Sequence, residues 1–313
     1  MLTIATRGSP LALAQAEQVR DALLAAHPGL RPEQVRLQVV RTSGDRFLGR
    51  PLAEIGGKGL FTKEIEEALL AGAADIAVHS AKDMPTRLPE GLRLAAFPPR
   101  ADPRDALISR HDGGLDRLPE AARVGTASLR RRAQLLRRRP DLLVELLRGN
   151  VGRRIARIDA GEFDATLLAL AGLERLGLAE RASHVLSPEE MLPAPAQGAI
   201  AIEARTDDTR IADLLAPLDD PGTRVTVAAE RALLDALDGS CRTPIAALAR
   251  CDGGEVRLVA RLLEPDGSWC AEERGDAPAD EDAAAALGRR LGERLRARAG
   301  DGFFRRLADA APS

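Results

Sequence analysis

The sequence predicts an α/β protein with mostly parallel sheets, on the strength of three observations. First, apolar strand-like runs alternate with helical patterns from the N-terminus to about residue 205. Second, two proline-rich stretches, at 97–100 and 192–196, bracket a central block. Third, the alternation changes after residue 221. The hydrophobic fraction of 45% and charged fraction of 29% are typical of an ordinary globular chain.

The elements follow in order along the chain. Ser9 is a good N-cap residue and Pro10 suits the first helical position, so a helix should begin there. Further helices are expected where apolar residues recur at helical spacing. The expected helices are Pro10–Ala26, Thr62–Ala71, Leu129–Arg139 and Val151–Ala160. The expected strands are Leu2–Thr6, Val35–Thr42, Asp75–His79, Leu92–Phe97, Asp105–Ser109, Arg123–Gly125, Leu142–Leu147, Asp164–Leu170 and Ala199–Ala204.

Three domains are expected. The strand after the second proline-rich stretch can return to the sheet of the first domain, which would give two α/β lobes joined by two crossings around a central cleft. The first domain would comprise residues 1–98 with 199–216, and the second residues 104–192. A smaller α+β domain, residues 221–313, would follow. In it we expect a helix at Thr223–Leu237 and a hairpin around Glu264–Gly267.

The stretch 124–141 carries six arginines and no acid before its last residue. Arg137 to Arg139 would lie in the last turn of the predicted helix, where the helix dipole favours cations. Arg130 and Arg131 would lie in the first turn, where the dipole disfavours them. A negative group should therefore offset their charge, although a solvated arginine face remains open.

Cations also follow other strands. In open α/β sheets, ligands bind beyond the carboxyl ends of the strands. Arginine binds carboxylates and phosphates in a bidentate manner. The pattern therefore indicates a substrate that bears several acidic groups. The cations at strand ends are Arg7, Lys82, Arg130, Arg131, Arg148, Arg154 and Arg175.

Composition argues against other ligand classes. The chain has no Tyr, one Trp, six Phe and a net charge of −2, so it lacks the exposed aromatics and basic balance of a single-strand binder. Duplex binding through phosphates alone stays open. Three cysteines and four scattered histidines give no metal-ligand spacing, so no metal site is expected.

The most apolar run, 165–173, is shorter than the ~20 residues that span a bilayer. The N-terminus does not look like a signal peptide, so we expect a cytoplasmic protein without membrane partners.

Two single residues stand out. Cys241 follows Asp-Gly-Ser at an expected helix end and precedes Arg242, a setting that can favour the thiolate. Cys251 and Cys270 lie in strand-like runs, where cysteine usually acts as a small buried hydrophobe. Asp83 is the only acid in Ala77–Met84, at a strand end rich in cations.

Several long motifs resemble the porphobilinogen deaminase family, in collinear order over nearly the whole chain. They begin at Ala5-Thr-Arg-Gly-Ser-Pro, Gly56-Gly-Lys-Gly-Leu-Phe, Ala77-Val-His-Ser-Ala-Lys-Asp, Val124-Gly-Thr-Ala-Ser-Leu-Arg-Arg, Leu147-Arg-Gly-Asn-Val-Gly, Gln197-Gly-Ala and Gly239-Ser-Cys. The resemblance implies two lobes like those of type II periplasmic binding proteins and a third, smaller domain. It further implies a cytoplasmic, monomeric transferase that joins four porphobilinogens head to tail and releases ammonia and hydroxymethylbilane.

The resemblance also implies a site. A dipyrromethane cofactor would be attached through a thioether to Cys241, and Asp83 would be catalytic. Cofactor carboxylates would be bound by Lys82, Thr126, Ser128, Arg130, Arg131 and Arg148. Substrate would be bound by Arg7, Ser9, Lys58, Phe61, Arg154 and Arg175. The sequence departs from the family pattern at Glu54, where the family is usually basic. A non-catalytic anion-binding protein of the same two-lobed shape is the remaining alternative.

Overall fold

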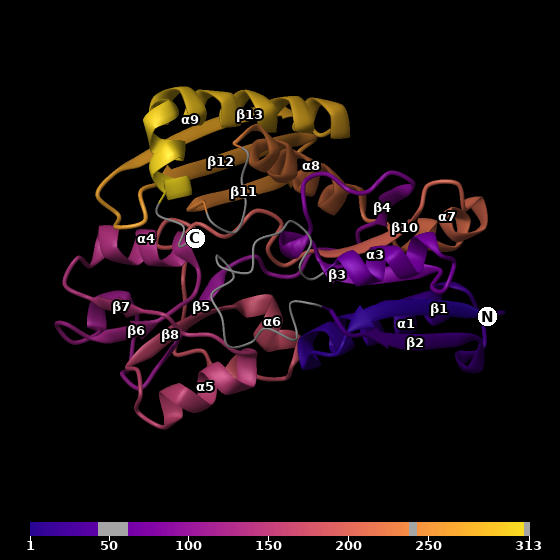
Figure 1. Ribbon diagram of the computed structural model, residues 1–313, viewed down its shortest axis with the longest axis horizontal. Helices are drawn as coiled ribbons and strands as arrows, with labels where there is room; N and C mark the ends of the chain where they lie inside the picture. The colour runs from indigo at the N-terminus through magenta and orange to yellow at the C-terminus, as the bar shows by residue number, and fades with distance from the viewer. Residues whose placement is uncertain (43–61, 238–242, 310–313) are drawn as a thin grey trace. The chain divides into compact units, whose positions relative to one another are not determined.

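The computed structural model describes residues 1–42, 62–237 and 243–309. They fall into two compact units, residues 1–101 with 198–224 and residues 102–197 with 225–313. Figure 1 labels many of the helices and strands on the ribbon, and its bar relates colour to residue number. The division into three domains stays a prediction.

The first unit contains a five-stranded sheet in the order β2-β1-β3-β10-β4. Strands β1, β2 and β3 run parallel, and β10 is antiparallel to both of its neighbours, β3 and β4. The prediction that the strand after the second proline-rich stretch returns to the first sheet is therefore confirmed. The bounds are β1 (Leu2–Arg7), β2 (Val35–Val40), β3 (Ile76–Ser80), β4 (Leu92–Ala96) and β10 (Ile200–Arg205).

Helices cover both faces of this sheet. On one face, α1 (Pro10–Ala26) packs Val19 and Leu23 against strand residues such as Ile4. On the other face, α3 (Lys63–Leu70) packs Ile65 and Leu69 against small residues, among them Ala77 of β3. A shorter helix, α7 (Thr209–Leu215), follows β10. Because both faces are covered, the carboxyl ends of β1 and β3 are the natural place for a ligand.

The second unit contains a sheet of the same design, in the order β7-β6-β8-β5-β9. Strands β6, β7 and β8 are parallel, while β5 is antiparallel to β8 and β9. Helix α4 packs on one face through Leu135, and α5 and α6 pack on the other. The bounds are β5 (Asp105–Ser109), β6 (Arg123–Gly125), β7 (Leu143–Glu145), β8 (Ala165–Ala169), β9 (His184–Val185), α4 (Leu129–Arg138), α5 (Val151–Asp159) and α6 (Leu170–Arg175).

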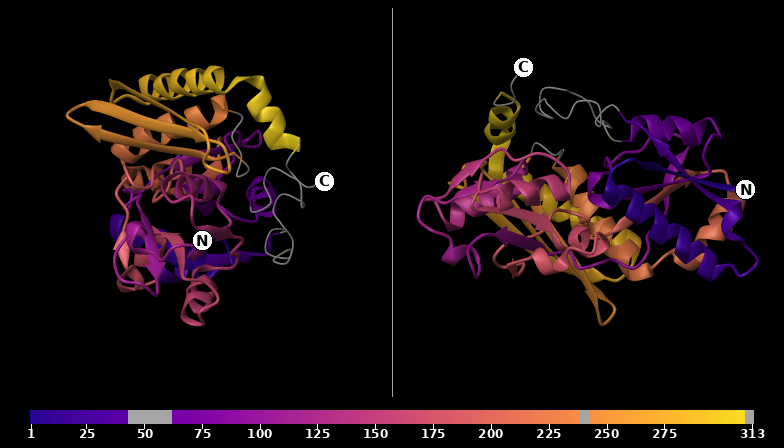
Figure 2. Two further views of the ribbon diagram at one scale, coloured as in Figure 1. Left: turned by 90° about the vertical axis from the view of Figure 1, so that its left-hand side faces the viewer. Right: turned by 90° about the horizontal axis from the view of Figure 1, so that it is seen from below.

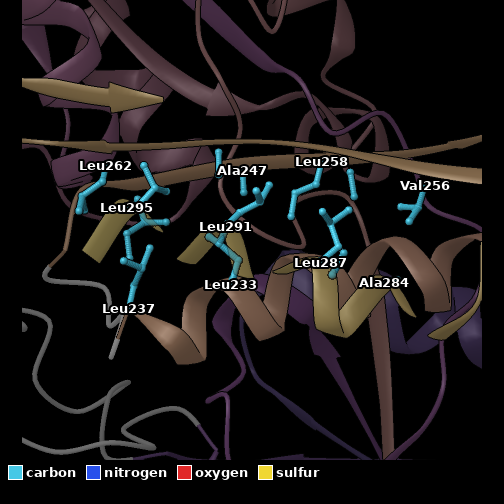
Figure 3. Close-up of a cluster of buried hydrophobic side chains, with 14 of the residues drawn as sticks. Leu233, Leu237, Ala247, Val256, Leu258, Leu262, Ala284, Leu287, Leu291 and Leu295 are labelled. Atoms are coloured by element: carbon cyan, nitrogen blue, oxygen red, sulfur yellow. The ribbon is translucent and has the colours of Figure 1, made fainter. Parts of the chain in front are cut away.

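The same unit carries a three-stranded antiparallel sheet, β11 (Ile245–Asp252), β12 (Glu255–Leu263) and β13 (Cys270–Pro278). Figure 3 shows its leucine-rich core with α8 (Pro221–Ala236) and α9 (Glu281–Asp309). The two helices approach closely because α9 has glycine at the contact. A Cβ on Gly288 would lie 2.0 Å from the Ala229 carbonyl oxygen.

This region has a bent helix, a confirmed hairpin and two cysteines that are less buried than expected. Helix α9 bends at Gly300, where φ is 70° and ψ is 165°, and Figure 2 shows the turn of the yellow helix. Glycine tolerates this left-handed φ without strain. The expectation of buried cysteines was wrong for Cys251, which is exposed near the end of β11, and Cys270 is only partly buried. The hairpin expected around 264–267 is confirmed by the pairing of β12 with β13.

Candidate functional site

Asp83 lies in a cavity of about 70 Å³ at the carboxyl ends of β1 and β3. At ~10–15 Å³ for each water molecule, this space holds several waters or a small polar group. The carboxyl ends of parallel strands meet at one edge of the sheet, which explains why residues distant in sequence converge here. The polar residues that line the cavity are Arg7, Ser9, Gln15, Thr62, His79, Ser80 and Asp83.

A tight turn presents Asp83. Strand β3 ends at Ser80, and residues Ala81–Asp83 form a single turn of 3-10 helix. The N–H of Ala81 donates to the carbonyl of Ala199 at 3.0 Å, and the Met84 side chain is buried. Pro85 disfavours a helical conformation at Met84, which is extended with ψ 137°. The turn is therefore fixed on both sides of Asp83, while the Asp83 side chain itself stays exposed.

Arg7 and Ser9 stand at the end of β1. Arg7 is the last residue of the strand and is half-buried. The Ser9 hydroxyl accepts the backbone N–H of Ala12 at 3.2 Å and so caps α1. This contact uses one acceptor position and leaves the Ser9 O–H able to donate to an anion. Lys82, in the turn after β3, is half-buried.

In the second unit, the first turn of α4 contains an ion-pair cluster. Asp105, at the start of β5, has no exposed surface, and Arg130 and Arg131 are 5% and 6% exposed. Arg130 Nη1 lies 2.7 Å from Asp105 Oδ2, and Arg131 Nη2 lies 2.7 Å from Oδ1. Gln197 Nε2 donates to Oδ1 at 3.0 Å. The negative group expected to offset these arginines is therefore at least partly the chain's own Asp105.

The electrostatics of this cluster follow from burial and pairing. Burial by itself raises the pKa of Asp105, but the charges of Arg130 and Arg131 outweigh burial and hold this pKa far below its usual range. Burial lowers the pKa of Arg130, and Asp105 opposes that effect. Two guanidinium groups against one carboxylate leave one net positive charge. The Nε atom of Arg130 is buried without a hydrogen-bond partner.

The expected hydroxyl and arginine ligands of this unit occupy cap and loop positions. The Ser128 hydroxyl caps α4 by accepting the N–H of Arg131 at 3.4 Å, and the Thr126 hydroxyl accepts the N–H of Ser128 at 3.1 Å. Arg154 Nε donates to the carbonyl of Gly149 at 2.7 Å in the turn before α5. Arg148 is half-buried in that turn.

Arg175 follows β8 as expected, but a short helix lies between them. It is the last residue of α6, which separates it from β8. Burial lowers its pKa, an effect that the neighbouring Glu174 opposes. An arginine stays charged under such a shift because its reference pKa lies above ~12.

Three expected site residues, Lys58, Phe61 and Cys241, lie outside the described residues, as does Glu54. Among the residues that are described, no group of three or more His, Cys, Asp or Glu could hold a metal ion. The search of these residues also found no helix long and apolar enough to cross a membrane.

Sequence reasoning missed the buried polar partners: Asp105 and Gln197 in the second unit, and Glu66, His79 and Glu203 in the first. A signal was present for two of them. Asp105 begins a strand that is otherwise apolar, and Glu203 interrupts the apolar strand 199–204. An acid inside a core strand is uncommon unless it is paired.

Comparison with known proteins gives matches along nearly the whole chain. Residues 2–213 match the family model "Porphobilinogen deaminase, dipyromethane cofactor binding domain", and residues 224–297 match "Porphobilinogen deaminase, C-terminal domain". The porphobilinogen deaminase of Nitrobacter winogradskyi is 55% identical over 311 residues, which are 99% of this chain and 97% of the relative. That of Paracoccus denitrificans is 54% identical over 304 residues, 97% of this chain and 96% of the relative.

Matches among solved structures include a TRAP periplasmic solute binding protein from Desulfovibrio salexigens. It is 13% identical to this chain, with a TM-score of 0.42, and the alignment covers 70% of this chain and 72% of that protein. The periplasmic aliphatic sulphonate binding protein of Escherichia coli is 14% identical, with a TM-score of 0.38, and the alignment covers 76% of this chain and 70% of that protein. The match of both family models and the identity over almost the full length decide the assignment: this chain belongs to the porphobilinogen deaminase family.

Proposed function

We infer that the protein joins four porphobilinogen molecules head to tail on a covalently bound dipyrromethane primer and releases ammonia and hydroxymethylbilane. The observation that carries this function is the match of residues 2–213 to the family's cofactor binding domain. Relatives that are 54% and 55% identical along almost the whole chain support it. The protein is therefore a transferase of porphyrin and heme biosynthesis.

The donor set of the chain fits a ligand rich in carboxylates. Each pyrrole ring of the primer and of the substrate carries an acetate and a propionate. The cluster at Arg130 and Arg131 keeps one net positive charge and the unpartnered Nε of Arg130, so it can still attract an anion. Hydroxyl groups at Thr126 and Ser128 stand beside it in sequence and can donate to carboxylate oxygens.

We propose that the residues expected from the sequence bind the acidic groups of cofactor and substrate. Cofactor carboxylates would be held by Lys82, Thr126, Ser128, Arg130, Arg131 and Arg148, with Cys241 as the covalent attachment point. Substrate carboxylates would be held by Arg7, Ser9, Lys58, Arg154 and Arg175, with Phe61 as an apolar contact. When bound, the dipyrromethane supplies the free pyrrole carbon to which the first substrate is joined.

We propose that Asp83 is the catalytic carboxylate. When porphobilinogen loses ammonia, positive charge develops on its pyrrole ring and spreads through the ring N–H. A fixed carboxylate that accepts this N–H stabilises the charge most strongly in the transition state. It can also transfer protons during loss of the amine. The exposed position of Asp83 on a turn fixed at Ala81 and Met84 supports this role.

The Asp83→Asn variant tests this role. It preserves shape, so it should fold, but its single-turnover rate should fall by ~10²–10⁴-fold because one electrostatic or acid–base contribution is lost. The rate is measured by quenching the reaction at set times and determining the mass of the covalent protein–pyrrole complex by mass spectrometry. The Glu90→Gln variant, at an exposed position after the same turn, is the matched control and should react normally. An Asp83→Asn rate within tenfold of the parent would place the essential carboxylate elsewhere.

We further propose that the enzyme works as a cytoplasmic monomer without nucleic-acid partners. The net charge of −2 supports the last point, since it lacks the basic excess of a nucleic-acid binder. Light scattering on the eluted protein should give the mass of one chain. Retention on duplex DNA at moderate salt would contradict the absence of a nucleic-acid partner.

A further inference from the structure

The cavity that contains Asp83 is also bordered by a buried histidine. His79 is the penultimate residue of β3, four residues before Asp83, and its side chain is 5% exposed. Its Nε2 atom lies 3.1 Å from Oε2 of Glu203, a side chain with no exposed surface. In the antiparallel pair β3–β10, His79 faces Ala201 and Glu203 faces Ala77, so the two side chains are diagonal neighbours on one face.

A second buried carboxyl lies on the same face. Glu66 of α3 is 7% exposed, in a helix that otherwise packs Ile65 and Leu69 onto the sheet. Burial raises the pKa of Glu66, and the charge of Glu203 raises it further, whereas Thr62 and His79 act in the opposite direction. Within the described residues, Oε1 of Glu66 and Oε1 of Glu203 are buried without a hydrogen-bond partner.

Packing alone does not account for these three groups. Buried polar groups are costly unless they are paired, and apolar residues would cover this face at lower cost. If all three were ionised, one imidazolium and two carboxylates would leave one net negative charge in the core. A proton on Glu66, beside an imidazolium–carboxylate pair, brings the group to neutrality. The arrangement therefore favours retention of protons next to the cavity.

We propose that His79 is a second acid–base residue of the Asp83 cavity, and that Glu203 and Glu66 keep a proton available on it. Glu203 holds Nε2 as a donor, as a carboxylate does for many catalytic histidines. This contact occupies Nε2, and we assign the other ring nitrogen, Nδ1, to a ligand in the cavity that His79 lines. This inference deepens the proposed function and rests on it.

The chemistry balances without a further reactant. The C–N bond of porphobilinogen breaks with its electron pair on nitrogen, and nitrogen leaves as ammonia with a proton from His79. A C–C bond forms to the attacked pyrrole carbon, and the proton that this carbon then loses restores His79. In this scheme Asp83 stabilises the positive charge between the two steps, and His79 performs the proton transfers that Asp83 could otherwise perform.

Other charged groups lie on the elements packed against His79. Apart from Glu66 and Glu203, they lie on β1, β10 and the turn after β3, and helix α3 adds Lys63, Glu64 and Glu67. Arg205 is already paired with Asp208 at 2.8 Å. The groups on β1, β10 and the turn are Arg7, Arg205, Lys82 and Asp83.

The test uses the cofactor-loaded full chain with His79→Gln, and with Glu67→Gln on the exposed side of α3 as control. The single-turnover rate at saturating porphobilinogen is measured from pH 5 to 9. We expect His79→Gln to react at least ~10²-fold more slowly and to lose the decline in rate that the parent shows as its acid group deprotonates. Glu67→Gln should match the parent at every pH.

Glu203→Gln separates this role from a structural one. The variant should lower the pH at which the His79 ring loses its proton, followed by NMR of isotope-labelled histidine in a chain that has four histidines. The rate profile should shift by the same amount. If His79→Gln folds and retains both the parent rate and its pH profile, the inference is wrong, while the function stands as long as the parent forms product. A parent that forms no product would instead refute the proposed function.

Discussion

Replacing Asp105 with asparagine removes the carboxylate that both buried arginines of α4 contact. Arg130 and Arg131 each lie 2.7 Å from Asp105, and all three side chains are almost completely buried. Asparagine has nearly the same shape, so the packing is preserved. What changes is the charge, because the variant leaves two guanidinium groups in the core without this counter-ion.

The magnitude follows from that burial. Breaking a buried ion pair by removing one partner costs ~3–5 kcal/mol, because the other charge stays buried and uncompensated. At ~2–4 °C per kcal/mol for a unit of this size, the melting temperature should fall by ~6–20 °C. The matched control is Asp116→Asn, which breaks the pair with Arg138, where the side chains are 66% and 36% exposed. Such an exposed pair contributes ~0–1 kcal/mol.

The pH dependence gives an independent check. The folded-state pKa of Asp105 is depressed, so its stabilisation is complete above the unfolded-state pKa of ~3.9 and is lost as pH falls below that value. The difference between parent and Asp105→Asn should therefore shrink by ~1.4 kcal/mol for each pH unit below ~4. Urea unfolding of samples matched for cofactor content measures it. A cost below 1 kcal/mol at pH 7, equal to that of Asp116→Asn, would refute the reasoning.

The remaining predictions concern the cofactor and chain growth. Cys241→Ser should lack the covalent pyrrole mass in an intact-mass measurement, whereas Cys251→Ser, at an exposed strand position, should retain it; retention in Cys241→Ser would exclude this thioether. Arg154→Leu and Arg175→Leu should load the cofactor but accumulate partly extended complexes, because fewer cations hold the growing set of carboxylates. The exposed neighbour Arg153→Leu should elongate normally, and equal elongation by all three would refute the assignment.

Local signals predicted much of the fold. The Ser9 cap and Pro10 give the start of α1, and the helix has the expected bounds. Helix α6 was missed because the expected strand 164–170 and the apolar residues after it form one apolar run, whereas the structure ends β8 at Ala169 and begins a buried helix at Leu170. Periodicity cannot separate a short buried strand from a buried helix. Strand β11 was expected only as a strand-like run around Cys251, without bounds, and the structure gives it the bounds Ile245–Asp252.

Part of the candidate site could be predicted from local sequence, and part of it depends on contacts between distant residues. Cations at strand ends are visible in the sequence because each lies at the end of its own strand. This placed Arg7 at the end of β1, and Lys82 and Arg148 in the segments after β3 and β7. Their buried partners are set by sheet register and not by local pattern. His79 and Glu203 are 124 residues apart in sequence and meet only because β10 returns beside β3.

The central claim is that this chain extends a covalent dipyrromethane with porphobilinogen, and intact mass tests it most directly. The purified protein should be heavier than its sequence by the two pyrrole units of the primer. After addition of porphobilinogen in small excess, heavier species should appear in equal steps, each one substrate less ammonia, followed by hydroxymethylbilane in solution and return to the starting mass. A protein that has only the mass of its chain, and stays unchanged while it binds porphobilinogen, would contradict the account.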